Sequence, residues 1–563
     1  MGFLARIDDT LRTKESIFAE GAESGRRGGK KWGNEDLDPS PPQHRTWGSW
    51  NYFAFFWAVS FNPVAWNAGS SLVALGLLWW EALLAAAIAC MFCGTCLVLN
   101  SRGPSVYHVG FPVYLRIGAG LYGSLWFVFI RGIVAVFFFG TQSYYAAQMV
   151  NVMLRCIFST SWTHRPNHLP QSAGVTSNIL GCFFIFWFAQ LGFMFIHPRN
   201  SRILYTVKSI ACPPVLLATF AFIVAKSGGL GQTHALTTTT VSAATIGWNF
   251  MGGISSVAGG LMTEVSSNPD LARYAKKSRA TTWPQWFGLV IAKTLCTFLG
   301  IGASSAVKTL WGTAYWNIWD LYSAILDHYF SGGARCAIFL ACVVQAFAVV
   351  ATNLASNSLP VGSDLTGLFP RYFNIRRGQI ACAILSIATC PWILVNNAAS
   401  FLTFLNANVC FLSPLVSIMI TDYFLIRKGN VHVPSLYSPH STSPYWYKGG
   451  FNIRAFVAWT VAVVSVIHGL AGSFNSHYNL TSTHIYKMGM LLTFAIAGPV
   501  YYAICWFWPP MIYPQEHENA PKTFEYMGKT DGYFDSDIIT GVVAEENNSL
   551  ETDHQQTMFD EKV

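Results

Sequence analysis

Long apolar runs with few polar interruptions are the main pattern along this 563-residue chain. Ala82–Leu99, Cys336–Thr352 and Met488–Trp508 each approach the roughly 20 residues that cross a bilayer as a helix. Apolar and polar positions do not alternate in these runs, as they would in a membrane-spanning β-strand. Because only helices and closed barrels satisfy their backbone hydrogen bonds in lipid, the pattern predicts an all-α polytopic membrane protein.

About twelve spans fit the runs when each is given the length needed to cross a bilayer. The expected spans cover residues 50–75, 77–99, 124–150, 177–196, 204–225, 241–265, 283–307, 336–358, 379–396, 399–426, 453–471 and 486–508. We therefore expect three regions: an N-terminal tail (1–49), a transmembrane core (50–508) and a C-terminal tail (509–563), which is polar, acidic and predicted to be largely disordered.

Composition and charge support this class. Hydrophobic residues make up 52% of the chain and charged residues 11%, too few charges for a soluble protein of this size. The net charge of +8 comes mainly from basic residues in the N-terminal tail and in alternate loops, such as Lys276–Lys277 and Arg376–Arg377. This asymmetry follows the positive-inside rule and predicts that both termini are cytosolic, with no nucleic-acid partner. Cys90, Cys93 and Cys96 lack a second ligand cluster, so we expect packing rather than a metal site.

Two spans contain helix-breaking residues at matching places, five spans apart. Asn62-Pro63 interrupts the first span, and Gly252-Gly253 and Gly259-Gly260 interrupt the sixth. Paired broken helices are the sequence feature that best indicates a transporter site. The alternative is that Gly and Pro only allow close helix packing, as they commonly do in membranes. The coincidence of the two breaks favours a transporter.

Several uncharged polar side chains lie inside otherwise apolar spans. Gln142 is in the third span, and Asn353 and Asn357 share one side of the eighth. Amides carry both donors and acceptors and can pair with the edge of a planar heterocycle such as uracil or hydantoin. Interhelical hydrogen bonding is the alternative for each amide alone.

Ionisable groups inside spans are costly, so each needs a reason to be there. Glu264 is too short to reach water from the sixth span, and we expect it to couple transport to proton movement. Arg131 and Lys293 are expected to snorkel or pair locally near the ends of their spans. Asp270 and Arg273 are expected to form a gate or a structural pair near the cytosolic mouth.

The chain also resembles fungal nucleobase:cation symporter-1 proteins between residues 34 and 508. The motifs that carry the resemblance are Asn34–Pro39 with Pro41-Pro42 and Arg45–Trp47, Gly69–Leu72, Tyr107–Val113, Phe139–Gln142, Asn268–Tyr274, Phe369–Gly378, Phe411–Pro414 and Thr421–Tyr423. The resemblance implies a LeuT-type fold, a 5+5 inverted repeat followed by two extra helices. It also implies a plasma-membrane importer of a uracil- or allantoin-like ring, coupled to a proton or to sodium, with no further cofactor.

Site residues follow from the resemblance position by position. The implied substrate contacts are Asn62, Phe138, Gln142, Leu261 and Asn357, and the implied cation positions are Ala58, Phe61, Ala348, Ala351 and Thr352. Phe138 stands where relatives often have Trp, and Leu261 replaces an aromatic residue, so a two-sided sandwich of the ring is not expected. Thiamine or nicotinamide riboside therefore stays an alternative substrate, and Glu264 would favour a cationic one.

A nutrient receptor or a membrane enzyme is the distant alternative. An enzyme would need clustered catalytic side chains at one membrane face, and the histidines of this sequence are scattered. The cytosolic tails are a candidate platform for ubiquitin and trafficking machinery, with Lys522, Lys529 and Lys562 available for modification.

Overall fold

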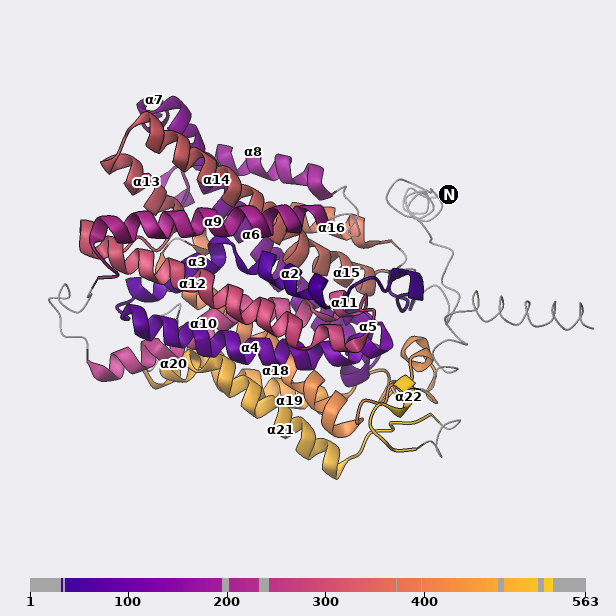
Figure 1. The fold of residues 1–563 in the computed structure, drawn as a ribbon. Helices are drawn as coiled ribbons and strands as arrows, with labels where there is room; N and C mark the ends of the chain where they lie inside the picture. The colour runs from indigo at the N-terminus through magenta and orange to yellow at the C-terminus, as the bar shows by residue number, and fades with distance from the viewer. Residues whose placement is uncertain are drawn as a thin grey trace, which may run out of the picture.

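The computed structural model describes residues 32–33, 36–194, 202–231, 242–370, 372–395, 397–473, 480–514 and 521–529. Every regular element among these residues is a helix, and the long helices run roughly parallel (Figure 1). The principal elements are α2 (Ser49–Ser60), α3 (Pro63–Ala74), α4 (Trp79–Tyr107), α5 (Phe111–Ala119), α6 (Gly123–Phe158), α8 (Ser177–Met194), α9 (Arg202–Ser227), α10 (Ala243–Ser267), α11 (Pro269–Ala272), α12 (Trp283–Trp311), α13 (Ile318–His328), α14 (Gly332–Thr352), the π-helix η6 (Asn353–Ser358), α15 (Leu359–Leu368), α16 (Ile375–Ile387), α17 (Pro391–Leu394), α18 (Ala398–Thr421), the π-helix η7 (Asp422–Ile426), α19 (Ile453–Gly472), α20 (Leu480–Lys487), α21 (Gly489–Phe507) and α22 (Tyr526–Lys529).

Nine helices in the described part of the chain are long and apolar enough to cross a membrane. The first, sixth and ninth expected spans are not among them. Helices α2 and α3 are two short pieces, α16 has 13 residues, and glycine and serine reduce the hydropathy of α10. The all-α membrane fold is confirmed, and the count of twelve spans stays a prediction.

The break expected in the first span is confirmed. Helix α2 ends at Ser60, and α3 begins at Pro63, where a missing N–H is tolerated. Asn62 caps α3 by accepting from the Ala65 N–H at 2.8 Å, and its Nδ2 donates to the Val59 carbonyl at 2.7 Å. The Asn62 side chain therefore holds the break together from both sides.

The break expected in the sixth span is wrong. Helix α10 is continuous from Ala243 to Ser267, through both glycine pairs. The glycines allow close packing instead: a Cβ on Gly259 would lie 1.8 Å from the Leu405 carbonyl oxygen of α18. The alternative interpretation of these glycines, close helix contact, is the correct one.

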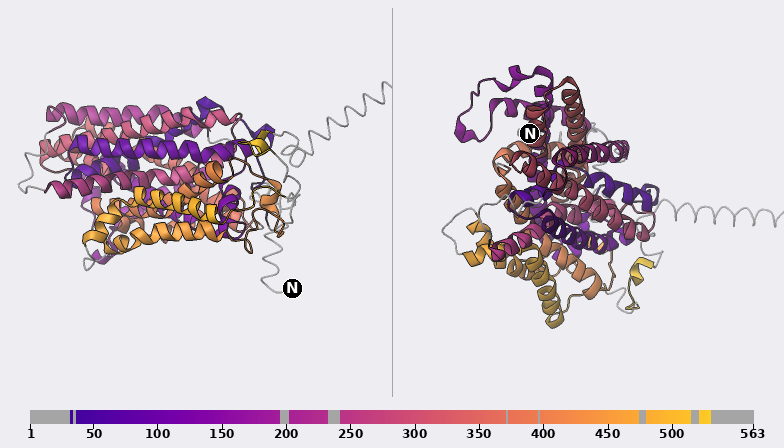
Figure 2. Two further views of the ribbon diagram at one scale, coloured as in Figure 1. Left: turned by 90° about the horizontal axis from the view of Figure 1, so that it is seen from below. Right: turned by 60° about the vertical axis from the view of Figure 1, so that its left-hand side comes forward.

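The helices form two groups with the candidate site between them. Helix α12 packs along α2, α3 and α4, and α10 packs against α4 and α18. Helix α6 packs against α8 and α14, and the α14–η6–α15 rod continues to Leu368, ten residues beyond the expected end of that span. The last helices, α19 and α21, form a layer along one flank (Figure 2).

Segments near both termini pack against the same end of the helices (Figure 1). Arg273 donates to the backbone carbonyls of Asp36 and Asp38, which fixes the segment before α2. Near the other terminus, buried Glu525 forms an ion pair with Arg102 at 2.6 Å. The disorder expected for the C-terminal tail is therefore wrong for residues 521–529, while most of this tail, including Lys562, lies outside the described residues.

The contact at Gly259 generates a test of the packing. Gly259→Ala forces the backbones of α10 and α18 apart. We expect the free energy of unfolding to fall by about 1–3 kcal/mol or more, because overpacking of a tight contact is destabilising. Gly260→Ala is the matched control, since its Cβ would meet only the end of the Leu405 side chain at 3.9 Å. Thermal unfolding of the detergent-solubilised variants measures both, and equal melting temperatures would contradict the packing argument.

Candidate substrate site

A cluster of buried amides lies where η6 packs against α6, and one of its members contacts α8. Asn357 donates from Nδ2 to Asn353 Oδ1 at 2.7 Å, and Asn353 in turn contacts Gln190 of α8. Gln142 lies on the neighbouring face of α6, and its buried Oε1 has no hydrogen-bond partner among the described residues. The structure thus places both expected substrate amides, Gln142 and Asn357, deep in the protein with acceptor oxygens uncommitted.

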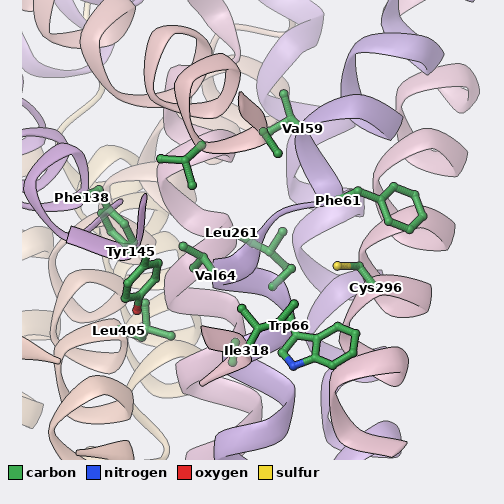
Figure 3. Packing of buried hydrophobic residues seen from close by; sticks show 14 of the residues in the cluster. Val59, Phe61, Val64, Trp66, Phe138, Tyr145, Leu261, Cys296, Ile318 and Leu405 are labelled. Atoms are coloured by element: carbon green, nitrogen blue, oxygen red, sulfur yellow. The ribbon is translucent and has the colours of Figure 1, made fainter. Parts of the chain in front are cut away.

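Apolar side chains surround this region. Phe138 lies one turn before Gln142 on α6 and packs against Phe404 of α18, with ring centroids 5.2 Å apart. Figure 3 shows Phe138, Leu261 of α10 and Val64 of α3 converging from separate helices. Asn62, by contrast, uses its amide on the backbone of the α2–α3 break.

Helix α13 covers the end of this region that lies away from α22 (Figure 1). Asn67 of α3 accepts from the Ile318 N–H at 3.2 Å and donates to Asn317 Oδ1 at 3.3 Å. The Trp319 ring of α13 lies 4.9 Å from the Tyr145 ring of α6. These contacts close the amide cluster from that end of the helices.

A buried lysine lies at the expected cation positions. Lys208 of α9 donates from Nζ to Thr352 Oγ1, whose hydroxyl donates to the Ala348 carbonyl. One turn further along α9, Cys212 donates to the Phe61 carbonyl at 3.4 Å. The structure therefore groups Phe61, Ala348 and Thr352 around α9.

The remaining two cation positions are buried alanines. Ala58 lies in the last turn of α2 and Ala351 immediately before Thr352. A methyl side chain has no ligand atom, so each could offer only its backbone carbonyl.

Glu264 lines a cavity between α2, α10, α11, η6 and α15. Its polar wall also includes Ser267, Asp270 and Ser356. Glu264 Oε1 accepts from Lys293 Nζ of α12 at 3.4 Å, and the buried Oε2 has no partner within the described part of the chain. The expectation that Lys293 is a span-end charge is wrong, because it is buried and paired across two helices.

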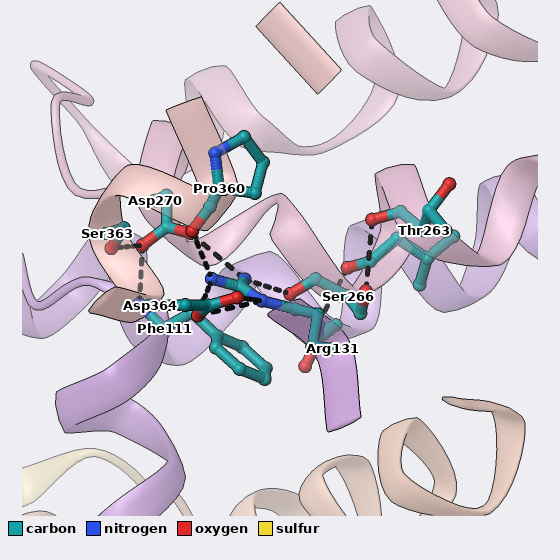
Figure 4. A network of polar contacts seen from close by, with 10 residues as sticks. Phe111, Arg131, Thr263, Ser266, Asp270, Pro360, Ser363 and Asp364 are labelled. Atoms are coloured by element: carbon teal, nitrogen blue, oxygen red, sulfur yellow. Dashed lines mark hydrogen bonds and ion pairs between the residues drawn. The ribbon is translucent and has the colours of Figure 1, made fainter. Parts of the chain in front are cut away.

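Arg131 is also buried, which corrects the expectation that it snorkels. Its guanidinium contacts Asp364 of α15 and, at 3.0 Å, Asp270 of α11, and its Cζ lies 3.6 Å from the centroid of the Phe111 ring (Figure 4). Asp270 Oδ1 also accepts from the Ser363 hydroxyl and from the Phe111 N–H, each at 2.9 Å. Two carboxylates therefore face one guanidinium.

The expected pairing of Asp270 with Arg273 is wrong for the same reason. Asp270 turns toward Arg131, and Arg273 donates to the segment before α2 and to Ser40 Oγ at 2.7 Å. His108 follows α4, and its Nδ1–H donates to the Arg273 carbonyl at 3.0 Å. Burial, with the nearby charge of Arg45, lowers the pKa of His108 to about 4, so this ring is neutral at pH 7.

Sequence reasoning missed four polar residues of this region: Lys208, Asp364, Ser143 and Gln190. Lys208 carried a signal, since a lysine inside an apolar helix is a functional candidate by default. Asp364 lies beyond the expected end of the eighth span at residue 358, so it was not considered as a buried charge. Ser143 and Gln190 are common polar residues in membrane helices, and only their contacts set them apart.

Three comparisons identify what the chain is similar to. The sequence model of a family described as "Permease for cytosine/purines, uracil, thiamine, allantoin" matches residues 39–497. An allantoin permease of Saccharomyces cerevisiae is 32% identical over 84% of this chain and 76% of its own length. A uracil permease of the same yeast is 30% identical with the same coverage, and a thiamine transporter is 26% identical over 84% of this chain and 79% of its own length.

The fold has a solved relative. Mhp1, a nucleobase-cation-symport-1 family transporter solved with bromovinylhydantoin bound, superposes with a TM-score of 0.65 at 22% identity, over 86% of this chain and 97% of its own. This similarity confirms the expected LeuT-type architecture.

The Arg131 cluster generates a stability test. Arg131→Leu leaves two carboxylates buried without their cation, and removing one partner of such a pair costs about 3–5 kcal/mol. Arg155→Leu is the control, because its partner Asp327 is 60% exposed and such pairs contribute about 0–1 kcal/mol. Thermal unfolding compares the two, and an equal loss would contradict a buried charge cluster.

Proposed function

Because the chain belongs to the family of permeases for cytosine/purines, uracil, thiamine and allantoin, we propose that it imports a nucleobase or a related small heterocycle, such as uracil or allantoin, by proton symport. The membrane is the plasma membrane, and both termini are cytosolic. The single observation that supports the substrate class best is the pair of buried amides, Gln142 and Asn357, whose acceptor oxygens have no protein partner among the described residues.

The lining supports a small, mostly neutral ring. A buried amide recognises a substrate by the N–H or C=O that completes its hydrogen bonds, and leaving such a group unpaired is costly. Phe138 offers one aromatic face, and Leu261 offers apolar contact only, so the ring is held by its edge more than by stacking.

Proton coupling is supported by what lies at the cation positions. The Lys208 ammonium hydrogen-bonds to Thr352, which is the hydroxyl expected to bind sodium. A second cation beside a buried ammonium would be repelled strongly in this poorly screened interior. The protonated lysine therefore takes the place that sodium would have.

Buried carboxylates supply groups that can accept the transported proton. Glu264 faces a cavity with one oxygen unpartnered, and the Arg131 cluster holds one more carboxylate than it has cations. A proton on either group would offset its cost of burial. Both groups lie on or next to the α10–α11 segment, so a proton there would act on a helix that borders the site.

A thiamine-like cation is the second candidate, and the unpartnered Oε2 of Glu264 favours it. Lys293 offsets the charge of that carboxylate, which supports the neutral ring as the first choice. Competition separates the two: uracil or allantoin blocks uptake of a neutral ring, whereas thiamine or nicotinamide riboside blocks uptake of a cation. A receptor without transport would bind the ligand and accumulate none.

The substrate amide Asn357 can be tested by uptake. In cells lacking their own permeases, we expect saturable uptake of one radiolabelled ring from a panel of uracil, allantoin, uridine, uric acid, thiamine and nicotinamide riboside. Asn357→Ala should reduce this uptake by about fivefold to a hundredfold at equal surface level, since a lost buried hydrogen bond costs about 1–3 kcal/mol.

Asn406→Ala is the matched control for Asn357→Ala. Asn406 is a buried amide of α18 that donates to the Tyr486 carbonyl at 2.8 Å, well separated in contacts from the amide cluster. It should leave the KM unchanged. Normal uptake by Asn357→Ala would contradict the assignment of the site. A parent protein that reaches the surface and takes up nothing would contradict the proposed function.

The coupling ion can be tested by changing the ions in the uptake assay. Replacing sodium by choline should leave uptake unchanged, and a protonophore should abolish accumulation. Lys208→Met should also abolish accumulation against a gradient, because the ammonium that hydrogen-bonds to Thr352 at the cation positions is lost. Lys226→Met, at the exposed end of the same helix, is the control and should transport normally. Sodium-dependent uptake by the parent would contradict proton coupling.

A further inference from the structure

The amide of Asn353 lies at the start of η6 and is almost completely buried. Its two Nδ2 protons are distributed over three oxygens, so that one proton is shared: the Phe139 carbonyl at 3.3 Å, Ser143 Oγ at 3.2 Å and Gln190 Oε1 at 3.1 Å. These partners come from α6 and α8, so the Asn353 amide joins three helices. Its remaining atom, Oδ1, faces Asn357.

The orientation of this amide is fixed by chemistry as well as by packing. The Phe139 carbonyl can only accept hydrogen bonds. Ser143 has one hydroxyl proton, which it donates to that same carbonyl at 2.8 Å, so its oxygen is left to accept. Gln190 Nε2 donates to Ser143 Oγ at 2.8 Å, which leaves Gln190 Oε1 facing Asn353. A reversed Asn353 would place its own oxygen against three acceptors.

The fixed amide determines what Asn357 can present. Asn353 Oδ1 accepts from Asn357 Nδ2 at 2.7 Å, which ties the nitrogen side of the Asn357 amide to η6. Asn357 Oδ1 forms no hydrogen bond to any residue that the structure describes. The group turned away from Asn353 is thus a hydrogen-bond acceptor.

Gln142 differs from Asn357 in this respect. Its Oε1 is buried without a partner among the described residues, and no contact there fixes which end of its amide points inward. An amide without fixed partners can turn to present either its oxygen or its nitrogen. The site therefore combines one acceptor of fixed polarity with one adaptable amide.

We infer that Ser143, Gln190 and Asn353 are positioning residues that hold Asn357 as a fixed acceptor, so the substrate must present an N–H donor to it. The matching chemical class is a neutral ring with an unsubstituted N–H beside a carbonyl, such as an imide or a cyclic ureide. This inference rests on the proposed function, because it requires Asn357 to contact the transported ring.

Competing ring analogues test the inference. In uptake assays with the labelled ring, hydantoin and uracil are compared with analogues in which oxygen replaces the ring N–H at N1 and with analogues methylated at N3, because oxygen between the two carbonyls at N3 would give a reactive anhydride. Oxygen at N1 keeps the size of the ring and turns that donor into an acceptor, and methylation at N3 removes the donor there. We expect one of the two changes in each ring to weaken competition by about tenfold to a hundredfold, because it leaves the Asn357 oxygen without a donor.

Variants identify the cause of that discrimination. Asn353→Leu removes the acceptor that holds Asn357 Nδ2, and the ratio between the inhibition constants of the N–H ring and the discriminated analogue should fall toward one. Gln190→Leu should lower the ratio partly, since the Phe139 carbonyl still orients Asn353. Gln148→Leu is the control: Gln148 is a buried amide of α6 bonded to Tyr144 at 2.7 Å, and the ratio should stay at the parent value.

The ratio of two inhibition constants does not depend on how much protein reaches the membrane. An unchanged ratio in Asn353→Leu would overturn the positioning role, as would a parent that accepts both the N1-oxygen and the N3-methyl analogues as well as the N–H rings. If Asn353→Leu does not reach the membrane, the ratio in Gln190→Leu and the competition series with the parent protein test the positioning role instead. A parent that neither takes up nor binds any ring overturns the proposed function, and this inference with it.

Discussion

The cost of burying a charge away from water is the constraint on which the structure depends. A buried charge left without a partner would cost far more than a single packing contact provides. Arg131, Asp270 and Asp364 satisfy this constraint together, and in doing so they join α6, α11 and α15. The same requirement explains Lys293 beside Glu264 and Lys208 beside Thr352. The charged contacts therefore link the helices that surround the candidate site.

Irregular backbone occurs where these polar groups gather. Asn62 caps the break between α2 and α3, and the amide pair Asn353–Asn357 lies in a π-helical segment. Such irregularities are tolerated at membrane depth only where protein groups satisfy the freed backbone, and π-turns are frequent at functional sites. Helix α10, by contrast, is continuous. Its glycines allow α18 to approach closely, and its polar residue Glu264 lines a cavity. The candidate substrate amides thus lie among helices that are also held by charge pairs and by close packing.

The sequence predicted the candidate amides but not how neighbouring helices orient them. Gln142 and Asn357 could be found because amides are rare in apolar spans, and the resemblance gave them a function. That Asn353 orients Asn357 could not be predicted, because it depends on Ser143 and Gln190, which come from two other helices. Arg131 and Lys293 were expected near water because a single span gives no information about its neighbours. Asp364 was missed because the apolar run suggested a span ending at residue 358, whereas the helical rod continues to Leu368.

The sequence by itself determined the membrane class, the approximate positions of most spans, the first helix break and the family motifs. These follow from local properties: the length of apolar runs, the rigidity of proline and the capping ability of asparagine. Only the tertiary structure decided which buried charges pair, which amide oxygens stay uncommitted, and whether glycines break α10 or pack it. Those outcomes depend on groups hundreds of residues apart, such as Arg131 and Asp364, that meet only when the helices assemble.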